Sequence, residues 1–79
     1  MMAKAYILVE TAVGKTKEVL DKIKTLRGVE TVNAVTGPYD IIATIESVSL
    51  NDIGDLVTTK IHPVSGIVRT VTCLALQSD

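Results

Sequence analysis

The sequence predicts an α+β protein of the ferredoxin-like type, with its elements in the order β-α-β-β-α-β. Two observations carry this prediction. Four short runs are rich in Val, Ile and Thr, as is typical of strands, and two longer stretches space their apolar residues three or four apart, as one face of a helix does. In this order the strands form a four-stranded antiparallel sheet, and both helices cover the same face of it.

The first half of the chain begins with a predicted strand over Lys4–Glu10, where aliphatic residues dominate. The loop Thr11–Gly14 leads into a helix that we expect over Lys15–Arg27. Gly28 follows at the position where helices commonly end in the left-handed conformation. The apolar face of this helix consists of Val19, Leu20, Ile23 and Leu26.

Two neighbouring strands follow, predicted over Val29–Val35 and Asp40–Glu46. The segment between them, Thr36–Tyr39, contains a Gly-Pro pair, and both residues favour tight turns. We therefore expect a hairpin turn that ends on a tyrosine and an aspartate.

A second helix is predicted after Ser49, which is a good helix cap, with the acidic Asp52 three positions later. Its apolar positions continue to Ile61, and Pro63 ends it because proline cannot continue a helical hydrogen-bond ladder. The last strand is predicted over Ile67–Leu76, after a Ser-Gly turn.

The composition indicates one domain, residues 1–79, in the cytoplasm. A net charge of −1 lacks the basic surface of a nucleic-acid binder or a polybasic membrane patch, and no run approaches the ~20 apolar residues of a membrane span. The single cysteine, Cys73, cannot form an internal disulfide and fits a reducing compartment. Since it lies within an apolar run, we expect Cys73 to fill the core.

We expect neither a metal nor an organic cofactor. One histidine and one cysteine cannot supply the ligands of a classical zinc site within one chain. The stretch Gly14-Lys15-Thr16 resembles the end of a phosphate-binding loop, but Val9 stands where that motif needs a glycine.

Both faces of the predicted sheet are apolar near its centre. In the third strand Ile41, Ala43 and Ile45 point one way and Ile42 points the other, and the last strand is equally two-sided. Because two helices cover only one face, the second face predicts an interface. We expect a homodimer packed sheet against sheet, of the dimeric α+β barrel type, with further assembly into a higher oligomer.

Five residues stand out as a candidate ligand site. Gly37 fixes the turn and permits close approach, Tyr39 offers a phenol and Asp40 a carboxylate that can accept from an ammonium group. Thr70 and Thr72 add two hydroxyls on one face of the last strand. These groups match a small zwitterion such as a free amino acid.

The turn Gly37-Pro38-Tyr39-Asp40, followed by the apolar strand IIATIE, resembles the Gly-x-Tyr-Asp turn of the effector-binding (RAM) domain of the Lrp/AsnC family of transcriptional regulators. Pro63, Gly66-Ile67 and the last strand RTVTCLAL fit the same pattern, so the resemblance covers essentially the whole chain. Full-length members carry an N-terminal helix-turn-helix domain, whereas here the first strand starts within a few residues of Met1. We therefore expect a stand-alone module without a DNA-binding domain and without direct DNA binding.

The resemblance implies sheet-to-sheet dimers that assemble into larger rings, often octamers, with amino-acid effectors at the contacts between dimers. Gly37, Tyr39 and Asp40 would form the turn side of that site, and Thr70 and Thr72 the strand side. It also implies a sensor that modulates full-length Lrp/AsnC-type regulators and is not an enzyme.

Two alternatives stay open at this point. A small dimeric α+β barrel enzyme, such as a monooxygenase or isomerase, would use His62 or Tyr39 as acid or base and would need several convergent polar groups in a cavity. A ligand-free structural oligomerisation module would need only the apolar face.

Overall fold

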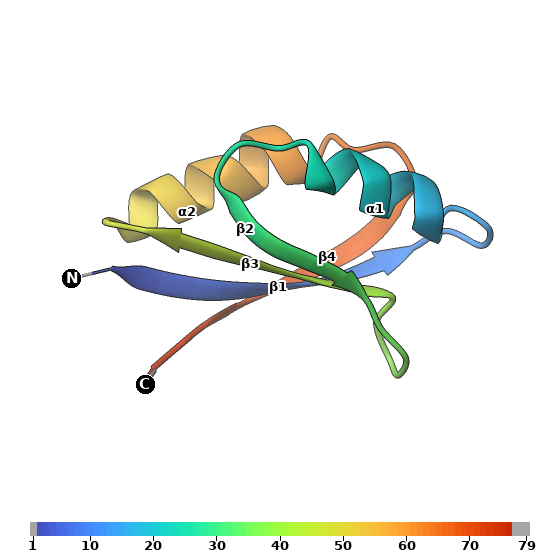
Figure 1. Ribbon diagram of the computed structural model, residues 1–79, viewed down its shortest axis with the longest axis horizontal. Coiled ribbons are helices and arrows are strands. Elements are labelled where there is room, and N and C mark those ends of the chain that lie inside the picture. The colour runs from blue at the N-terminus through green and yellow to red at the C-terminus, as the bar shows by residue number, and fades with distance from the viewer. Residues whose placement is uncertain (1, 77–79) are drawn as a thin grey trace.

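The structure, a computed structural model that describes residues 2–76, contains one four-stranded antiparallel sheet with its helices on one face (Figure 1). The predicted ferredoxin-like order β-α-β-β-α-β is confirmed. The elements are β1 (Ala3–Thr11), α1 (Thr16–Lys24), β2 (Val29–Ala34), β3 (Ile41–Ser47), α2 (Leu50–Leu56), the π-helical turn η1 (Val57–Ile61) and β4 (Ile67–Leu74).

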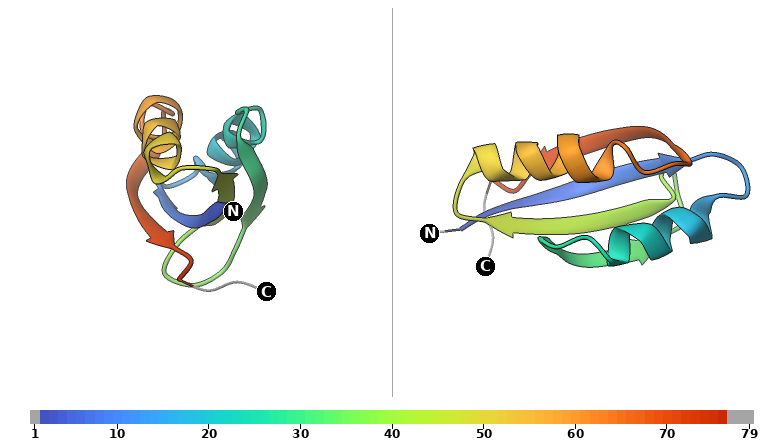
Figure 2. Two further views of the ribbon diagram at one scale, coloured as in Figure 1. Left: turned by 90° about the vertical axis from the view of Figure 1, so that its left-hand side faces the viewer. Right: turned by 90° about the horizontal axis from the view of Figure 1, so that it is seen from above.

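The strand order across the sheet is β2-β3-β1-β4, so the first strand of the chain lies inside the sheet. Ile7 of β1 faces Ala43 of β3 on one side and Thr72 of β4 on the other. The pairing of β1 with β4 shifts between Glu10 and Thr11, because their partners are Arg69 and Ile67 and Val68 of β4 is left as the extra residue. Figure 2 shows the two helices side by side above a strongly curved sheet, with β2 and β4 as its edges.

The first helix is shorter than the sequence predicted. It ends at Lys24, because the backbone N–H of Thr25 already bonds back to the carbonyl of Lys22, three residues earlier, at 3.1 Å. Gly28 then takes the left-handed conformation, with φ of +100°, and turns the chain into β2.

The second helix begins at the predicted cap. The Ser49 hydroxyl accepts from the backbone N–H of Asp52 at 3.1 Å, which satisfies one of the free donors of the first turn. After Leu56 the helix widens into the π-helical turn η1, and the N–H of His62 bonds to the carbonyl of Val57, five residues earlier, at 2.8 Å. The helical segment ends directly before Pro63, as predicted.

The core lies between the sheet and the helices and contains no aromatic residue. Alternate residues of the two inner strands point toward the helices, as the alternating strand geometry requires. Its fully or nearly fully buried members are Ala5, Ile7, Val9, Val19, Ile23, Ile41, Ala43, Ile45, Ile53, Val57, Ile61 and Val64.

The opposite face of the sheet, called here the open face, carries Tyr6, Leu8, Ile42, Val71 and Cys73 according to the strand register. Leu8, Ile42 and Val71 are half-buried and Cys73 is exposed. The expectation that both sheet faces are apolar is therefore confirmed. The expectation that Cys73 fills the core is wrong, because the register pairs it with Tyr6 on the face away from the helices.

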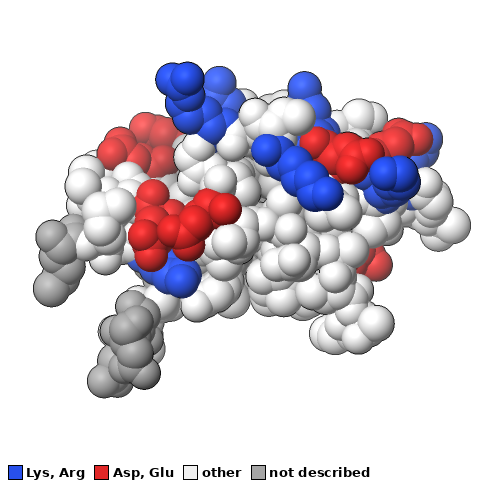
Figure 3. Space-filling view, in the orientation of Figure 1, with Lys and Arg blue, Asp and Glu red and all other residues white. Residues whose placement is uncertain are grey.

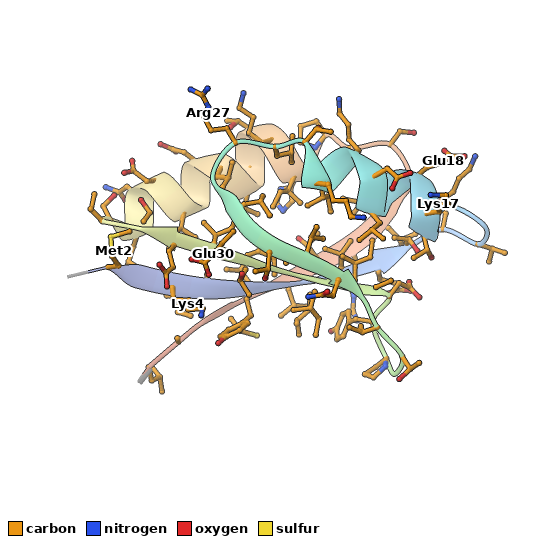
Figure 4. All side chains as sticks on the ribbon, in the orientation of Figure 1. Met2, Lys4, Lys17, Glu18, Arg27 and Glu30 are labelled. Atoms are coloured by element: carbon orange, nitrogen blue, oxygen red, sulfur yellow. The ribbon has the colours of Figure 1, made fainter. Side chains whose placement is uncertain are left out.

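Charged side chains are distributed unevenly over the surface. Figure 3 shows them over the helices and at the α2 end of the molecule, whereas the lower middle of that view is uncharged. Lys4 and Glu30 approach one another to 4.0 Å across the outside of the sheet (Figure 4). Within residues 2–76, no helix is both long and apolar enough to cross a membrane.

Candidate functional site

Two backbone hydrogen bonds close the turn between β2 and β3 and anchor it to β1. The N–H of Val35 bonds to the carbonyl of Asp40 at 2.9 Å, and the N–H of Asp40 bonds to the carbonyl of Val9 in β1 at 2.9 Å. Gly37 adopts φ of +112°, a conformation that residues with a side chain rarely take. The turn is therefore fixed to both neighbouring strands, and Tyr39 and Asp40 leave it at defined places.

Asp40 fastens this turn to the start of the first helix. Its Oδ2 accepts from the backbone N–H of Thr11 at 2.8 Å and from the Thr11 hydroxyl at 3.1 Å. The Thr11 hydroxyl also lies 2.7 Å from that of Thr16, the first residue of α1. The other carboxylate oxygen, Oδ1, makes no hydrogen bond to any residue that the structure describes.

Tyr39 is joined to an ion pair at the rim of the open face. Arg69 of β4 donates from Nη2 to the Tyr39 hydroxyl at 3.2 Å, and its guanidinium carbon lies 5.6 Å from the centre of the tyrosine ring. The Nε of Arg69 also lies 3.4 Å from a carboxylate oxygen of Glu10 on β1. A phenol, a guanidinium and a carboxylate thus form one chain of contacts, called here the Tyr39–Arg69–Glu10 cluster.

Thr70 and Thr72 lie on the other face of the sheet. They pair with Val9 and Ile7, whose side chains are buried under the helices, so the two hydroxyls share the helix face at the β4 edge. Thr70 Oγ1 lies 3.0 Å from Nε2 of His62, at the end of η1. The predicted shared face of the two threonines is confirmed.

Within one subunit the five candidate residues therefore do not converge. The structure connects Tyr39 to Arg69 and Asp40 to Thr11, and neither pair contacts Thr70 or Thr72, which lie on the helix face of β4. Sequence reasoning missed Arg69, Glu10 and Thr11. The alternation of side chains along β4 could have indicated Arg69, because it places Arg69 and Thr70 on opposite faces of the sheet. Arg69 therefore lies on the face where Tyr39, from the turn between β2 and β3, can contact it.

A family model for the Lrp/AsnC ligand binding domain matches residues 4–78. The chain belongs to the Lrp/AsnC family. The predicted resemblance is thereby confirmed, and the Gly-x-Tyr-Asp turn described above lies within the matched range.

Three known proteins are similar to this chain. An uncharacterised helix-turn-helix-type transcriptional regulator of Pyrococcus furiosus is 30% identical over 59 residues, which are 75% of this chain and 39% of that protein. A crystal structure of a Thermus thermophilus protein superposes with a TM-score of 0.90 at 30% identity, covering 98% of this chain and 96% of that one. AsnC of E. coli superposes with a TM-score of 0.89 at 22% identity, covering 96% of this chain and 52% of that one.

This Lrp/AsnC domain keeps its polar groups near the surface. The core contains no buried polar or charged residue within the described part of the chain, and the same part holds no group of three metal-ligating side chains. The groups available for chemistry at the turn are therefore those of the Tyr39–Arg69–Glu10 cluster and the free oxygen of Asp40.

Proposed function

We propose that this domain is an amino-acid sensor that acts through assembly. Its turn binds one free amino acid, and the bound state favours one oligomeric arrangement over another, since a ligand shifts an equilibrium by its differential affinity for the two states. The domain then modulates full-length Lrp/AsnC-type regulators in the cytoplasm and catalyses no reaction.

One observation carries the proposal: the rigid turn stands beside groups of both charges. A free amino acid needs an anionic partner for its ammonium and a cationic partner for its carboxylate. Asp40 Oδ1 is the carboxylate oxygen not engaged by Thr11, and Arg69 offers the planar guanidinium that suits a carboxylate. In our proposal the ammonium meets Asp40, while the carboxylate meets Arg69 and the Tyr39 hydroxyl.

The strand side of the site comes from another subunit in this proposal. Thr70 and Thr72 lie on the helix face of β4, whereas Tyr39 contacts Arg69 on the open face, so we infer that the two threonines meet the ligand bound at the turn of another subunit. The open face supports a sheet-to-sheet dimer, because a large apolar patch on a small domain usually marks an interface. Dimers would then assemble further, up to an octamer, with the amino acid at the contacts between them.

The relatives agree with a regulatory role. The Pyrococcus furiosus relative is described as a transcriptional regulator. A transcriptional regulator from Neisseria meningitidis, whose structure is a complex with L-methionine, has the same fold, with a TM-score of 0.83 at 17% identity over 95% of this chain. The absence of buried polar groups in residues 2–76 favours a binding domain over an enzyme.

The test is a thermal-shift panel of the twenty amino acids on three proteins: wild type, Arg69→Gln and, as a matched control, Lys22→Gln. Lys22 is exposed on α1 and lies outside the cluster. A ligand at about 100 times its Kd stabilises the protein by about 2.7 kcal/mol. We expect a shift for one or a few amino acids that Arg69→Gln loses and Lys22→Gln keeps.

Asp40→Ala is a poor first variant, because it also removes the contact with Thr11 and so lowers the stability itself. No shift with any amino acid would refute amino-acid sensing and leave a ligand-free oligomerisation module.

The proposed modulation of a full-length regulator needs a separate test. The domain and a full-length Lrp/AsnC-type regulator should co-elute in size exclusion in a ligand-dependent way, and separate elution under all conditions would refute that part.

A further inference from the structure

His62, the only histidine of the chain, contacts one of the two threonines on the strand side of the proposed site. Its Nε2 lies 3.0 Å from Oγ1 of Thr70 on β4. An imidazole nitrogen donates or accepts a hydrogen bond according to whether it carries a proton, so this contact decides what the Thr70 hydroxyl can offer to a ligand.

The π-helical turn η1 brings His62 to β4. Ile53, Val57 and Ile61 are all buried in the core, so the helical segment keeps one side against the sheet as far as its last residue. His62 follows directly, and its N–H bonds to the carbonyl of Val57, five residues earlier. A π-helical turn contains more residues than an α-helical turn, which changes the direction of the side chain that follows it, and such turns are frequent at functional sites.

The helix face of β4 stays accessible around this contact. Thr70 is half-buried, His62 and Thr72 are exposed, and Leu74 at the end of the strand is 46% exposed. Figure 2 shows the helical segment of α2 and η1 beside β4, which is an edge of the sheet. Another subunit can therefore approach the Thr70 hydroxyl while His62 holds it.

The protonation of His62 determines where the hydrogen of the Thr70 hydroxyl points. A protonated imidazole carries hydrogen on both nitrogens, so Nε2 donates to Thr70 Oγ1 and the hydrogen of Thr70 is free for an acceptor on a ligand. A neutral imidazole with its hydrogen on Nδ1 accepts at Nε2 instead, and Thr70 then donates its hydrogen to His62. Histidine changes between its charged and neutral forms between about pH 5 and pH 8.

No carboxylate competes with Thr70 for His62 within residues 2–76. The four ion pairs in that part of the chain all join other residues, so no carboxylate oxygen lies within 4.0 Å of the His62 ring nitrogens. On the strands beside it, the charged Glu10 and Arg69 belong to the open face. The charged residues on the helical elements around His62 are Asp55 of α2, Lys60 of η1 and the pair Lys15–Glu18, whose lysine lies beside Gly66.

We propose that His62 is a positioning residue of the ligand site, which holds the oxygen of Thr70 so that the Thr70 hydroxyl donates to the carboxylate of an amino acid bound at the turn of another subunit. The inference rests on the function proposed above and adds a regulation to it, because the ligand then binds most tightly where His62 is protonated. His62 acts through Thr70 and does not itself contact the ligand.

The test is isothermal titration calorimetry of the full chain with each of the twenty free amino acids, at several pH values between about pH 5 and pH 8. For an amino acid that binds, we expect the Kd to fall by about two- to tenfold as the pH is lowered, which is the range of one net hydrogen bond. His62→Gln offers an amide nitrogen near the place of Nε2 and cannot titrate, so it should bind tightly at every pH. His62→Leu has no donor and should bind weakly at every pH.

The matched control is Lys60→Gln, which removes a neighbouring charge from an exposed position of η1. It should keep the pH dependence of the wild type, because the contact between His62 and Thr70 stays intact. Loss of the pH dependence in this control would assign it to the general charge of the surface and would overturn the proposal.

Two threonine variants test whether His62 acts through Thr70. Thr70→Val should lose the pH dependence, whereas Thr72→Val should bind more weakly but keep it. In the ligand-free protein, the 15N signals of the His62 ring should change in Thr70→Val and stay unchanged in Thr72→Val.

Two kinds of failure can be told apart. Wild-type pH dependence in His62→Gln or in Thr70→Val, or His62 ring signals that Thr70→Val leaves unchanged, would overturn this inference and leave amino-acid binding intact. Binding of no amino acid at any pH would overturn the proposed function, and this inference with it.

Discussion

Replacing Asp40 by alanine should destabilise the domain even without any ligand. Both hydrogen bonds from Thr11 to Asp40 Oδ2 would be lost, at 2.8 Å and 3.1 Å in the intact protein. Hydrogen bonds to a charged group contribute about 1.5–3 kcal/mol each. Since both bonds come from one residue and the site is half-buried, we take about 2 kcal/mol for the pair, at the low end.

A loss of that size is large for a domain of 79 residues. At about 4–8 °C per kcal/mol it lowers Tm by roughly 8–16 °C. The assay is thermal and urea unfolding followed by circular dichroism, at one fixed protein concentration, because assembly itself adds to the apparent stability. The matched control is Asp55→Ala, which removes the same side chain from an exposed position of α2.

A double-mutant cycle tests whether Asp40 stabilises the domain through its contacts with Thr11. Thr11→Val removes the hydroxyl that contacts both Asp40 and Thr16, while it keeps the backbone N–H. If Asp40 acts through Thr11, the two substitutions together should cost less than the sum of their separate effects. The proposed role of Asp40 in holding the turn would be refuted if the Tm of Asp40→Ala lay within about 2 °C of that of Asp55→Ala. On a scale of about 4–8 °C per kcal/mol, so small a difference is incompatible with the expected loss of stability.

Three other predictions test the fold and the interface. In urea unfolding, Gly66→Ala should lower the free energy of unfolding by about 1–3 kcal/mol more than Gly14→Ala does, because of overpacking. A Cβ at Gly66 would lie 3.0 Å from Val19, whereas nothing lies within 4 Å of a Cβ at Gly14. Both glycines have positive φ, so equal losses of stability would contradict this prediction. Ser49→Ala should cost about 1 kcal/mol through loss of the α2 cap, again by urea unfolding, and an unchanged midpoint would mean that water replaces the cap. Val71→Asp on the open face should dissociate the proposed dimer in light scattering while the monomer stays folded, and an unchanged molar mass would place the interface elsewhere.

The sequence was sufficient for the local and periodic features of the molecule. The two-sided pattern of β3 indicated which residues share a face of the sheet, and Ser49 indicated where α2 begins. These features depend on neighbours within a few residues. The end of α1 at Lys24 was missed because its last turn tightens before Gly28, and no residue type between them requires that.

The site was less predictable, because its contacts join distant parts of the chain. Asp40 meets Thr11 across 29 positions, and Tyr39 meets Arg69 across 30. The sequence marked the turn and the shared face of the two threonines on β4, but it could not reveal that this face is turned away from Tyr39. That relation depends on the register of β1 with β4, which no single segment encodes.

The position of β1 between β3 and β4 has a consequence for how the protein is made. β1 is synthesised before the other three strands of this sheet, yet one of its edges stays bare until β4, the last of the four, has been synthesised. A bare strand edge beside apolar side chains invites pairing with other chains. Nascent copies of this domain on one polysome are therefore exposed to mispairing through β1, and substitutions that slow the docking of β4 will lower the yield of folded protein more than they lower its Tm.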